Sequence, residues 1–118
     1  MKSNIPQRTF EFAREIIALC IDLEKQPGVS RIIGRQLLRS GTSVGANIEE
    51  GQASQSDADF INKYSIACKE ARETRYWLRL LAASAIAPGE TLDRIDTECN
   101  EIIAILTSII KKMRAKLK

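Results

Sequence analysis

The sequence predicts an all-α protein, folded as an antiparallel up-down-up-down four-helix bundle. Three short breaks divide the chain into four long segments, and two of these segments carry unbroken apolar heptads. Aromatic residues make up only 5% of the chain whereas Ile, Leu and Ala are plentiful, which favours helices packed through aliphatic side chains over a sheet. Because the connections are short, consecutive helices are expected to run antiparallel.

The length of 118 residues fits one domain, 1–118, with no room for a second core. Apolar residues (44%) and charged residues (28%) are sufficient for a core and a solvated surface. No apolar stretch is long enough to cross a bilayer, and Met1–Pro6 lack the hydrophobic region of a signal peptide. We therefore expect a cytoplasmic protein without membrane contact.

Histidine is absent, which removes the commonest metal ligand and the usual general base at neutral pH. The three cysteines are an odd number, and each lies among apolar residues at helical spacing. We interpret Cys20, Cys68 and Cys99 as core residues in a reducing compartment. No cofactor is expected.

The first helix is expected at about residues 7–25 and the second at about 30–50, separated by Pro27-Gly28. The second contains Gly34, Gly41 and Gly45, each of which costs about 1 kcal/mol relative to Ala in a helix interior. Such a cost persists more easily where a neighbouring backbone approaches closely. The alternative is a kink at residues 40–43. The core stripe of the first helix comprises Phe12, Ile16, Leu19 and Leu23, flanked by Phe10, Ala13, Ile17 and Cys20.

The third helix is expected at about 57–85, with Ser56 as its N-cap, and the fourth at about 90–116, after Pro88-Gly89. Beyond its heptad the fourth helix carries Ile103, Ile105 and Ile110, and this breadth predicts a partner, most simply another copy. The heptad of the third helix is Phe60, Tyr64, Ala67, Ala71, Thr74, Leu78 and Leu81, and that of the fourth is Leu92, Ile95, Cys99, Ile102, Leu106, Ile109 and Met113.

Polar residues border the core of the second and third helices. Pairing of Arg39 with Glu70 or Glu73 is expected, since charges next to a core must be hydrogen-bonded. Three interpretations stay open: a network that fixes helix register, a binding or assembly surface, and acid–base catalysis. The predicted network comprises Arg39, Ser43, Asn47, Glu50, Lys63, Glu70, Glu73 and Arg75. Trp77, beside them, is either core or a stacking platform for bases.

The positive charge is concentrated at the C-terminus. The formal net charge is +3, yet the last eight residues contain five of the 18 basic residues and no acid. This stretch either completes a helix end, where the macrodipole favours cations, or contacts nucleic acid. The predicted contact residues are Lys111, Lys112, Arg114, Lys116 and Lys118.

Two blocks of the sequence resemble a known family. The stretch 35–51, RQLLRSGTSVGANIEEG, together with DFINK at 59–63 and ACKEARETRYWL at 67–78, is similar to the bacterial four helix bundle proteins, also known as the 23S rRNA intervening-sequence proteins. The resemblance implies an up-down bundle that assembles into a homopentamer. Related accessory variability proteins of diversity-generating retroelements bind nucleic acid and a reverse transcriptase. No catalytic role comes with the shared positions.

The sequence thus predicts a non-enzymatic, homo-oligomeric helical scaffold that associates with RNA, DNA or a ribonucleoprotein. The alternative is a protein–protein interaction or accessory module that does not contact nucleic acid. Catalytic, cofactor and metal sites are expected to be absent.

Overall fold

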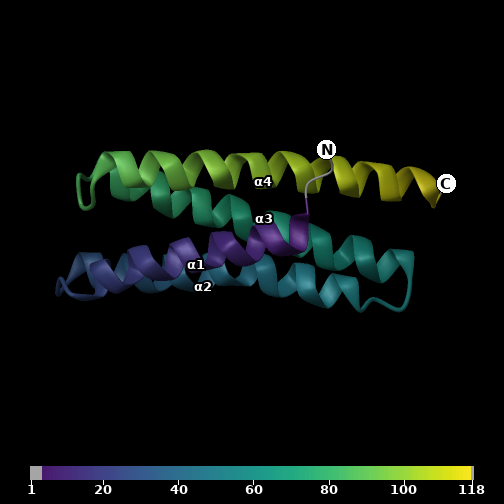
Figure 1. Cartoon of the computed structure of the whole chain (residues 1–118), viewed down its shortest axis with the longest axis horizontal. Helices are drawn as coiled ribbons and strands as arrows, with labels where there is room; N and C mark the ends of the chain where they lie inside the picture. The colour runs from purple at the N-terminus through teal and green to yellow at the C-terminus, as the bar shows by residue number, and fades with distance from the viewer. Residues whose placement is uncertain (1–3, 118) are drawn as a thin grey trace.

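The structure is a computed structural model that describes residues 4–117. Four long helices, joined by short connections, run antiparallel in a bundle of 49 × 24 × 21 Å (Figure 1). This confirms the predicted all-α fold class. The helices are α1 (Ile5–Glu24), α2 (Val29–Gln52), α3 (Asp57–Ala83) and α4 (Gly89–Lys116), each beginning and ending within two residues of the expected position. Among the described helices, none combines the length and apolarity needed to cross a bilayer.

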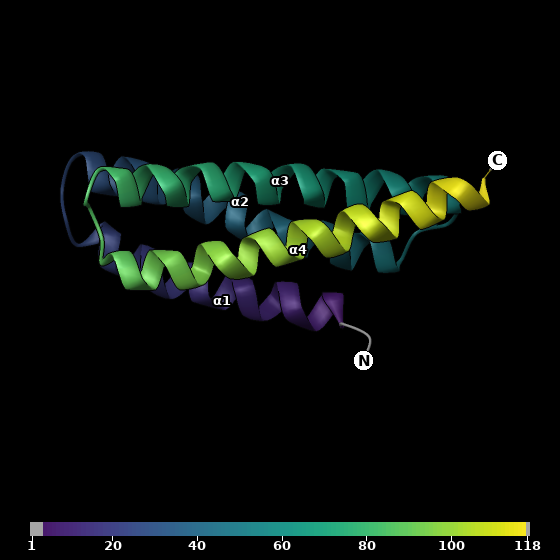
Figure 2. The same ribbon diagram turned by 90° about the horizontal axis from the view of Figure 1, so that it is seen from above.

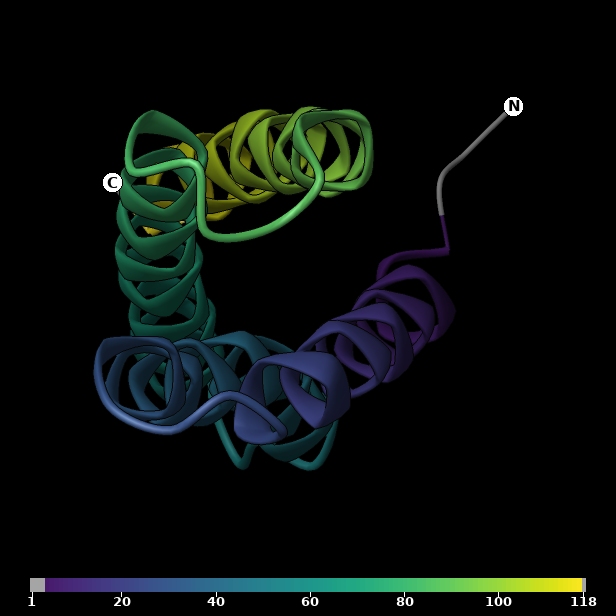
Figure 3. The ribbon, with the colours of Figure 1, turned by 90° about the vertical axis from the view of Figure 1, so that its left-hand side faces the viewer.

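The helices pack in chain order, and the seam between α1 and α4 is the loosest. α2 packs on both α1 and α3, α3 packs on α4, and α1 meets α4 least. Viewed end-on, the ribbons of α1 and α4 are more widely separated than those of consecutive helices (Figure 3). Because α1 is shorter, the C-terminal end of α4 extends beyond the start of α1 (Figure 2).

The helix boundaries follow local chemistry. The side chain of Asn4 accepts a hydrogen bond from Gln7 N, and that of Ser56 accepts one from Asp59 N, as expected for N-caps. The third helix stops two residues earlier than expected because Ala85 adopts a left-handed φ of 54°. The amide of Ile86 then bonds back to the carbonyl of Leu81, which closes the helix end.

The glycines of α2 allow a close approach to α1. A Cβ at Gly41 would lie 2.8 Å from Ile16 Cγ2, and one at Gly45 would lie 3.2 Å from the carbonyl oxygen of Thr9. Residues 29–52 form one continuous helix, so the helix is not interrupted at residues 40–43. The glycine face of α2 packs directly against α1.

The core contains the predicted heptads, with a shift at the end of α4. Ile103 and Ile110 are buried, whereas Ile109 and Met113 are only partly buried against the core. The additional isoleucines of α4 are thus largely buried within the bundle, because this part of α4 packs on α3. The exposed large apolar side chains lie mostly elsewhere: Phe10, Ile17, Ile21, Val29, Ile32, Leu38, Tyr76 and Leu117.

The three cysteines are buried and unpaired, as the sequence predicted. Burial raises the pKa of Cys20 to about 11 and that of Cys99 to about 12. Both thiols are therefore protonated at neutral pH and are inert core groups.

Candidate functional site

The predicted polar network centres on Arg39 of α2. Its guanidinium forms an ion pair with Glu73 and lies 3.4 Å from Glu70 Oε1, so both expected acids of α3 are partners. Trp77 Nε1 donates a hydrogen bond of 3.1 Å to Glu73 Oε2. The indole N–H and the Arg39 guanidinium both lower the pKa of Glu73. Glu73 is thus a charged acceptor at neutral pH.

The other predicted network residues are not part of this cluster. Lys63 Nζ pairs with Glu50 Oε1 at 2.9 Å, and the hydrogen bond to Glu50 raises the pKa of Lys63. Ser43 and Asn47 bond to carbonyls of their own helix, at Arg39 O and Ser43 O, respectively. Arg75 points to the opposite neighbour, where its Nε lies 3.1 Å from Asp96 Oδ1 of α4. The expectation of one network is thus replaced by three separate pairings.

Trp77 has a structural role in this arrangement. It is partly buried, packs against the core and is held by Glu73, while Tyr76 lies edge-on to it at 5.2 Å. Of the two adjacent aromatic residues, Tyr76 is the exposed one, at 56%.

Sequence reasoning missed the contacts that cross the bundle. Arg8 of α1 forms a bidentate pair with Glu98 of α4 at 2.7 and 2.8 Å, and also contacts Glu101 at 2.6 Å. Inside the bundle, Thr74 Oγ1 of α3 lies 2.9 Å from Ser40 Oγ of α2, and both residues are fully buried. The only available sequence signal was a hydroxyl residue at a core position of each helix.

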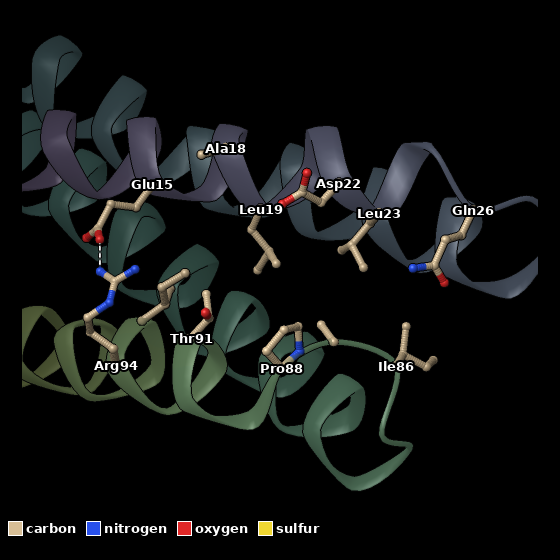
Figure 4. Close-up of a pocket in the computed structure, with 12 residues that line it drawn as sticks. Glu15, Ala18, Leu19, Asp22, Leu23, Gln26, Ile86, Pro88, Thr91 and Arg94 are labelled. Carbon is tan, nitrogen blue, oxygen red and sulfur yellow. Dashed lines mark hydrogen bonds and ion pairs between the residues drawn. The ribbon is translucent and has the colours of Figure 1, made fainter.

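A cavity of about 340 Å³ lies in the loose seam between α1 and the start of α4 (Figure 4). Its floor is apolar, with Leu19 and Leu23 of α1 facing Ile95 of α4. One rim is closed by the ion pair between Glu15 and Arg94. No nucleophile lies next to a base among the described lining residues, so the cavity offers apolar contact rather than a catalytic constellation. Within residues 4–117, no group of three or more Cys, Asp or Glu is placed to hold a metal ion.

The predicted basic residues of α4 divide between two sides of the helix. Lys111 and Arg114 line a groove against α3, with a volume of about 300 Å³, which also contains Lys69 and Arg72. Lys112 and Lys116 do not line this groove. Lys118 lies outside the described residues. The contribution of α3 was not predicted, although its cations at three-residue spacing are visible in the sequence.

A second groove, of about 180 Å³, lies between α1 and α2 and is apolar. Ile17 and Ile21 of α1 form one wall and Leu38 of α2 forms the other, with Glu24 and Arg35 at the rim. Arg35 Nη2 pairs with Glu24 Oε1 at 3.1 Å, so this rim carries both signs of charge.

The sequence matches the 23S rRNA-intervening sequence protein family over residues 1–108. The chain belongs to this family. A solved relative supports the assignment: a protein of unknown function from the S23 ribosomal protein family of Bacteroides thetaiotaomicron is 44% identical, with a TM-score of 0.85. That similarity covers 91% of this chain and 98% of the relative. Among proteins of curated function, none matches this sequence.

In this 23S rRNA-intervening sequence protein, the described side chains offer mainly ionic and apolar contacts. Glu50, Glu70 and Glu73 are already paired with Lys63 or Arg39, and the thiols of Cys20 and Cys99 are protonated. Two surfaces stand apart from these internal pairings: the apolar groove of α1 and α2, and the basic groove of α3 and α4.

Proposed function

We propose that the chain is a non-enzymatic helical scaffold that assembles with copies of itself and that the assembly associates with RNA, DNA or a ribonucleoprotein. The observation that carries the assembly is the apolar face of α1 and α2. Phe10, Ile17 and Ile21 of α1 are 57%, 43% and 56% exposed, and Leu38 of α2 is 37% exposed. Large apolar side chains gathered on one face of a small protein are typical of an interaction surface.

A second copy is the occupant that the charges of this face favour. Arg14 pairs with Glu11, and Arg31 and Arg35 both pair with Glu24, so acids and bases alternate along the rim. Such a surface has no excess charge to repel an identical molecule. Because each side chain is about half exposed, covering it contributes roughly 1 kcal/mol. Summed over the exposed apolar side chains of both copies, this burial is sufficient to offset the free-energy cost of association, which is at least about 4 kcal/mol.

The assembly is tested by light scattering after gel filtration at micromolar concentration. Wild-type protein is expected to have a mass that is a multiple of 13.2 kDa, with five copies as the number that the family resemblance implies. Ile21→Glu places a charge in the α1–α2 groove and is expected to yield the monomer. Leu117→Glu is the matched control, since Leu117 is similarly exposed (53%) but lies at the far end of α4. A monomeric wild type, or an Ile21→Glu variant of wild-type mass, contradicts the assembly proposal.

Association with nucleic acid is supported by the cations at the end of α4. Lys111, Lys112, Arg114 and Lys116 are exposed and form no ion pair with any acid that the structure describes. Direct phosphate contact makes the logarithm of the affinity fall linearly with the logarithm of the salt concentration. We expect such a slope for labelled RNA or DNA. If there is no binding at low salt, an accessory role through protein contacts alone is favoured.

A further inference from the structure

The outer face of α3 and α4 carries two adjoining grooves that share Arg72. The first, of about 300 Å³, is bordered by Lys69, Arg72, Lys111 and Arg114. The second, of about 200 Å³, continues along α3 to Arg79 and passes Tyr76. Neither groove has an acidic residue among its described lining side chains. Together they form a continuous basic groove, here called the α3–α4 groove.

The cations of this groove differ from those of the other half of the molecule. Within residues 4–52, every Arg and Lys forms an ion pair with an acid. In the described part of α3 and α4, by contrast, Arg72, Arg79, Lys111 and Arg114 form none. Arg75, which also lines the second groove, pairs with Asp96, but these four cations are left without an acid.

The spacing along each helix works against internal neutralisation. Arg72 has Lys69 three residues before it and Arg75 three residues after it, and Lys111 is followed three residues later by Arg114. Like charges one turn apart destabilise a helix by a few tenths of a kcal/mol per pair. An external polyanion would relieve this repulsion.

One further side chain in the groove is suited to a nucleotide. Tyr76 lies one turn from both Arg72 and Arg79 and is 56% exposed, so its ring is available for stacking on a base.

We propose that the α3–α4 groove binds the sugar–phosphate backbone of a single-stranded nucleic acid, with Tyr76 stacking on an unpaired base. This inference rests on the nucleic-acid association proposed above, and it assigns that association to a built groove instead of the C-terminal residues alone. Lys69 and Arg79 are ten residues apart, a helical distance of about 15 Å. A strand whose bases stack with the rise of one strand of B-DNA, about 3.4 Å per phosphate, places roughly four phosphates along this length.

The groove remains accessible when α1 and α2 contact another copy. In the end-on view, the outer side of α3 and α4 faces away from the outer side of α1 and α2 (Figure 3). An assembly that buries only the α1–α2 face therefore leaves the α3–α4 groove free to bind a strand.

The test is fluorescence anisotropy of a labelled oligouridine 12-mer across a salt series. Arg72→Gln and Arg79→Gln are each expected to weaken binding several-fold and to lower the salt slope by about 0.7. Tyr76→Ala is expected to weaken binding about 5-fold or more without changing the slope, because stacking releases no counterions. Lys25→Gln is the matched control: Lys25 is an exposed cation at the end of α1 that lines neither groove, and its loss should leave affinity and slope unchanged.

The results separate failure of the groove from failure of the association itself. If wild type binds the 12-mer but Arg72→Gln and Arg79→Gln bind equally well, the groove assignment is overturned. Loss of binding confined to a Lys112→Gln/Lys116→Gln variant would then leave the association standing. If wild type does not bind, both proposals fail. Equal binding of a 12-base-pair duplex, together with no effect of Tyr76→Ala, refutes the single-strand assignment, and equal binding of polyglutamate refutes recognition of a nucleic acid.

Discussion

Replacement of Gly41 by alanine tests whether α1 and α2 are packed as closely as the structure describes. The new Cβ would lie 2.8 Å from Ile16 Cγ2 and 2.9 Å from Cγ1, whereas carbon atoms at optimal contact are about 3.5–4.0 Å apart. Ile16 is fully buried and β-branched, so it has essentially one χ1 rotamer in a helix and cannot turn away.

Two effects of opposite sign decide the outcome. Alanine is favoured over glycine in a helix by about 1 kcal/mol. Overpacking of a tight core costs about 1–3 kcal/mol. We therefore expect Gly41→Ala to lower the free energy of unfolding by up to about 2 kcal/mol. The measurement is urea unfolding followed by circular dichroism at a fixed protein concentration, since assembly makes stability depend on concentration.

Gly89→Ala is the control for helix propensity alone. A Cβ at Gly89 meets no atom within 4 Å, so this variant is expected to be as stable as wild type or up to about 1 kcal/mol more stable. Adding Ile16→Leu to Gly41→Ala removes one of the two clashing γ-carbons and should restore part of the loss. If Gly41→Ala is as stable as Gly89→Ala, the close helix contact is refuted.

Three further predictions concern buried and paired groups. Thr74→Val removes the hydroxyl that contacts Ser40 and should lower the free energy of unfolding by about 1 kcal/mol. In a double-mutant cycle with Ser40→Ala, the double variant should lose less than the sum of the two single losses. Additive losses would argue against the hydrogen bond between the two residues. The folded-state pKa of Glu73 is lowered, so its charge stabilises the fold above the ordinary value of 4.5, and this contribution is lost as the pH falls through the folded pKa. Glu73→Gln should therefore be less stable than wild type at pH 7 in urea titrations and approach it in acid, and a constant difference at all pH values contradicts this. Cys20 and Cys99 should resist iodoacetamide at pH 8 in the folded protein and react when it is unfolded, as peptide mass spectrometry would report; rapid native labelling of either would contradict their burial.

The four helices were predictable because their signals are local. Pro27-Gly28 and Pro88-Gly89 interrupt the helices, and Ser56 caps the third one. Heptad periodicity then assigns the core side of each helix without knowledge of its neighbours. The predicted end of the third helix was two residues too late because the left-handed residue that ends the helix is an alanine, Ala85, where glycine is more common.

The candidate site was less predictable because it depends on which neighbour each helix face meets. Arg39 was correctly matched with Glu70 and Glu73, since α2 and α3 are consecutive. Arg75 was assigned to the same seam but pairs with Asp96 of α4, because it lies toward the other neighbour of α3. Periodicity alone does not distinguish these two sides.

The surfaces proposed for assembly and for strand binding required the packed structure. The apolar excess was expected on the fourth helix, yet Ile103 and Ile110 are buried and exposed apolar residues gather on α1 and α2. The net charge of +3 also hid the unpaired cations of α3, because acids elsewhere in the chain compensate for them in the total. Only the pairing of individual side chains shows which cations remain without an acid.

Native mass spectrometry of the wild-type protein with the oligouridine 12-mer tests the central claim most directly, because it counts both copies and strands. The predicted spectrum contains an oligomer of the 13.2-kDa chain carrying bound strand. Ile21→Glu should remove the oligomer, and Arg72→Gln should lower the fraction of oligomer that carries strand several-fold while leaving the oligomer intact. A wild-type spectrum with only free monomer, or loss of both properties in both variants, would contradict the assignment of assembly and strand binding to separate faces.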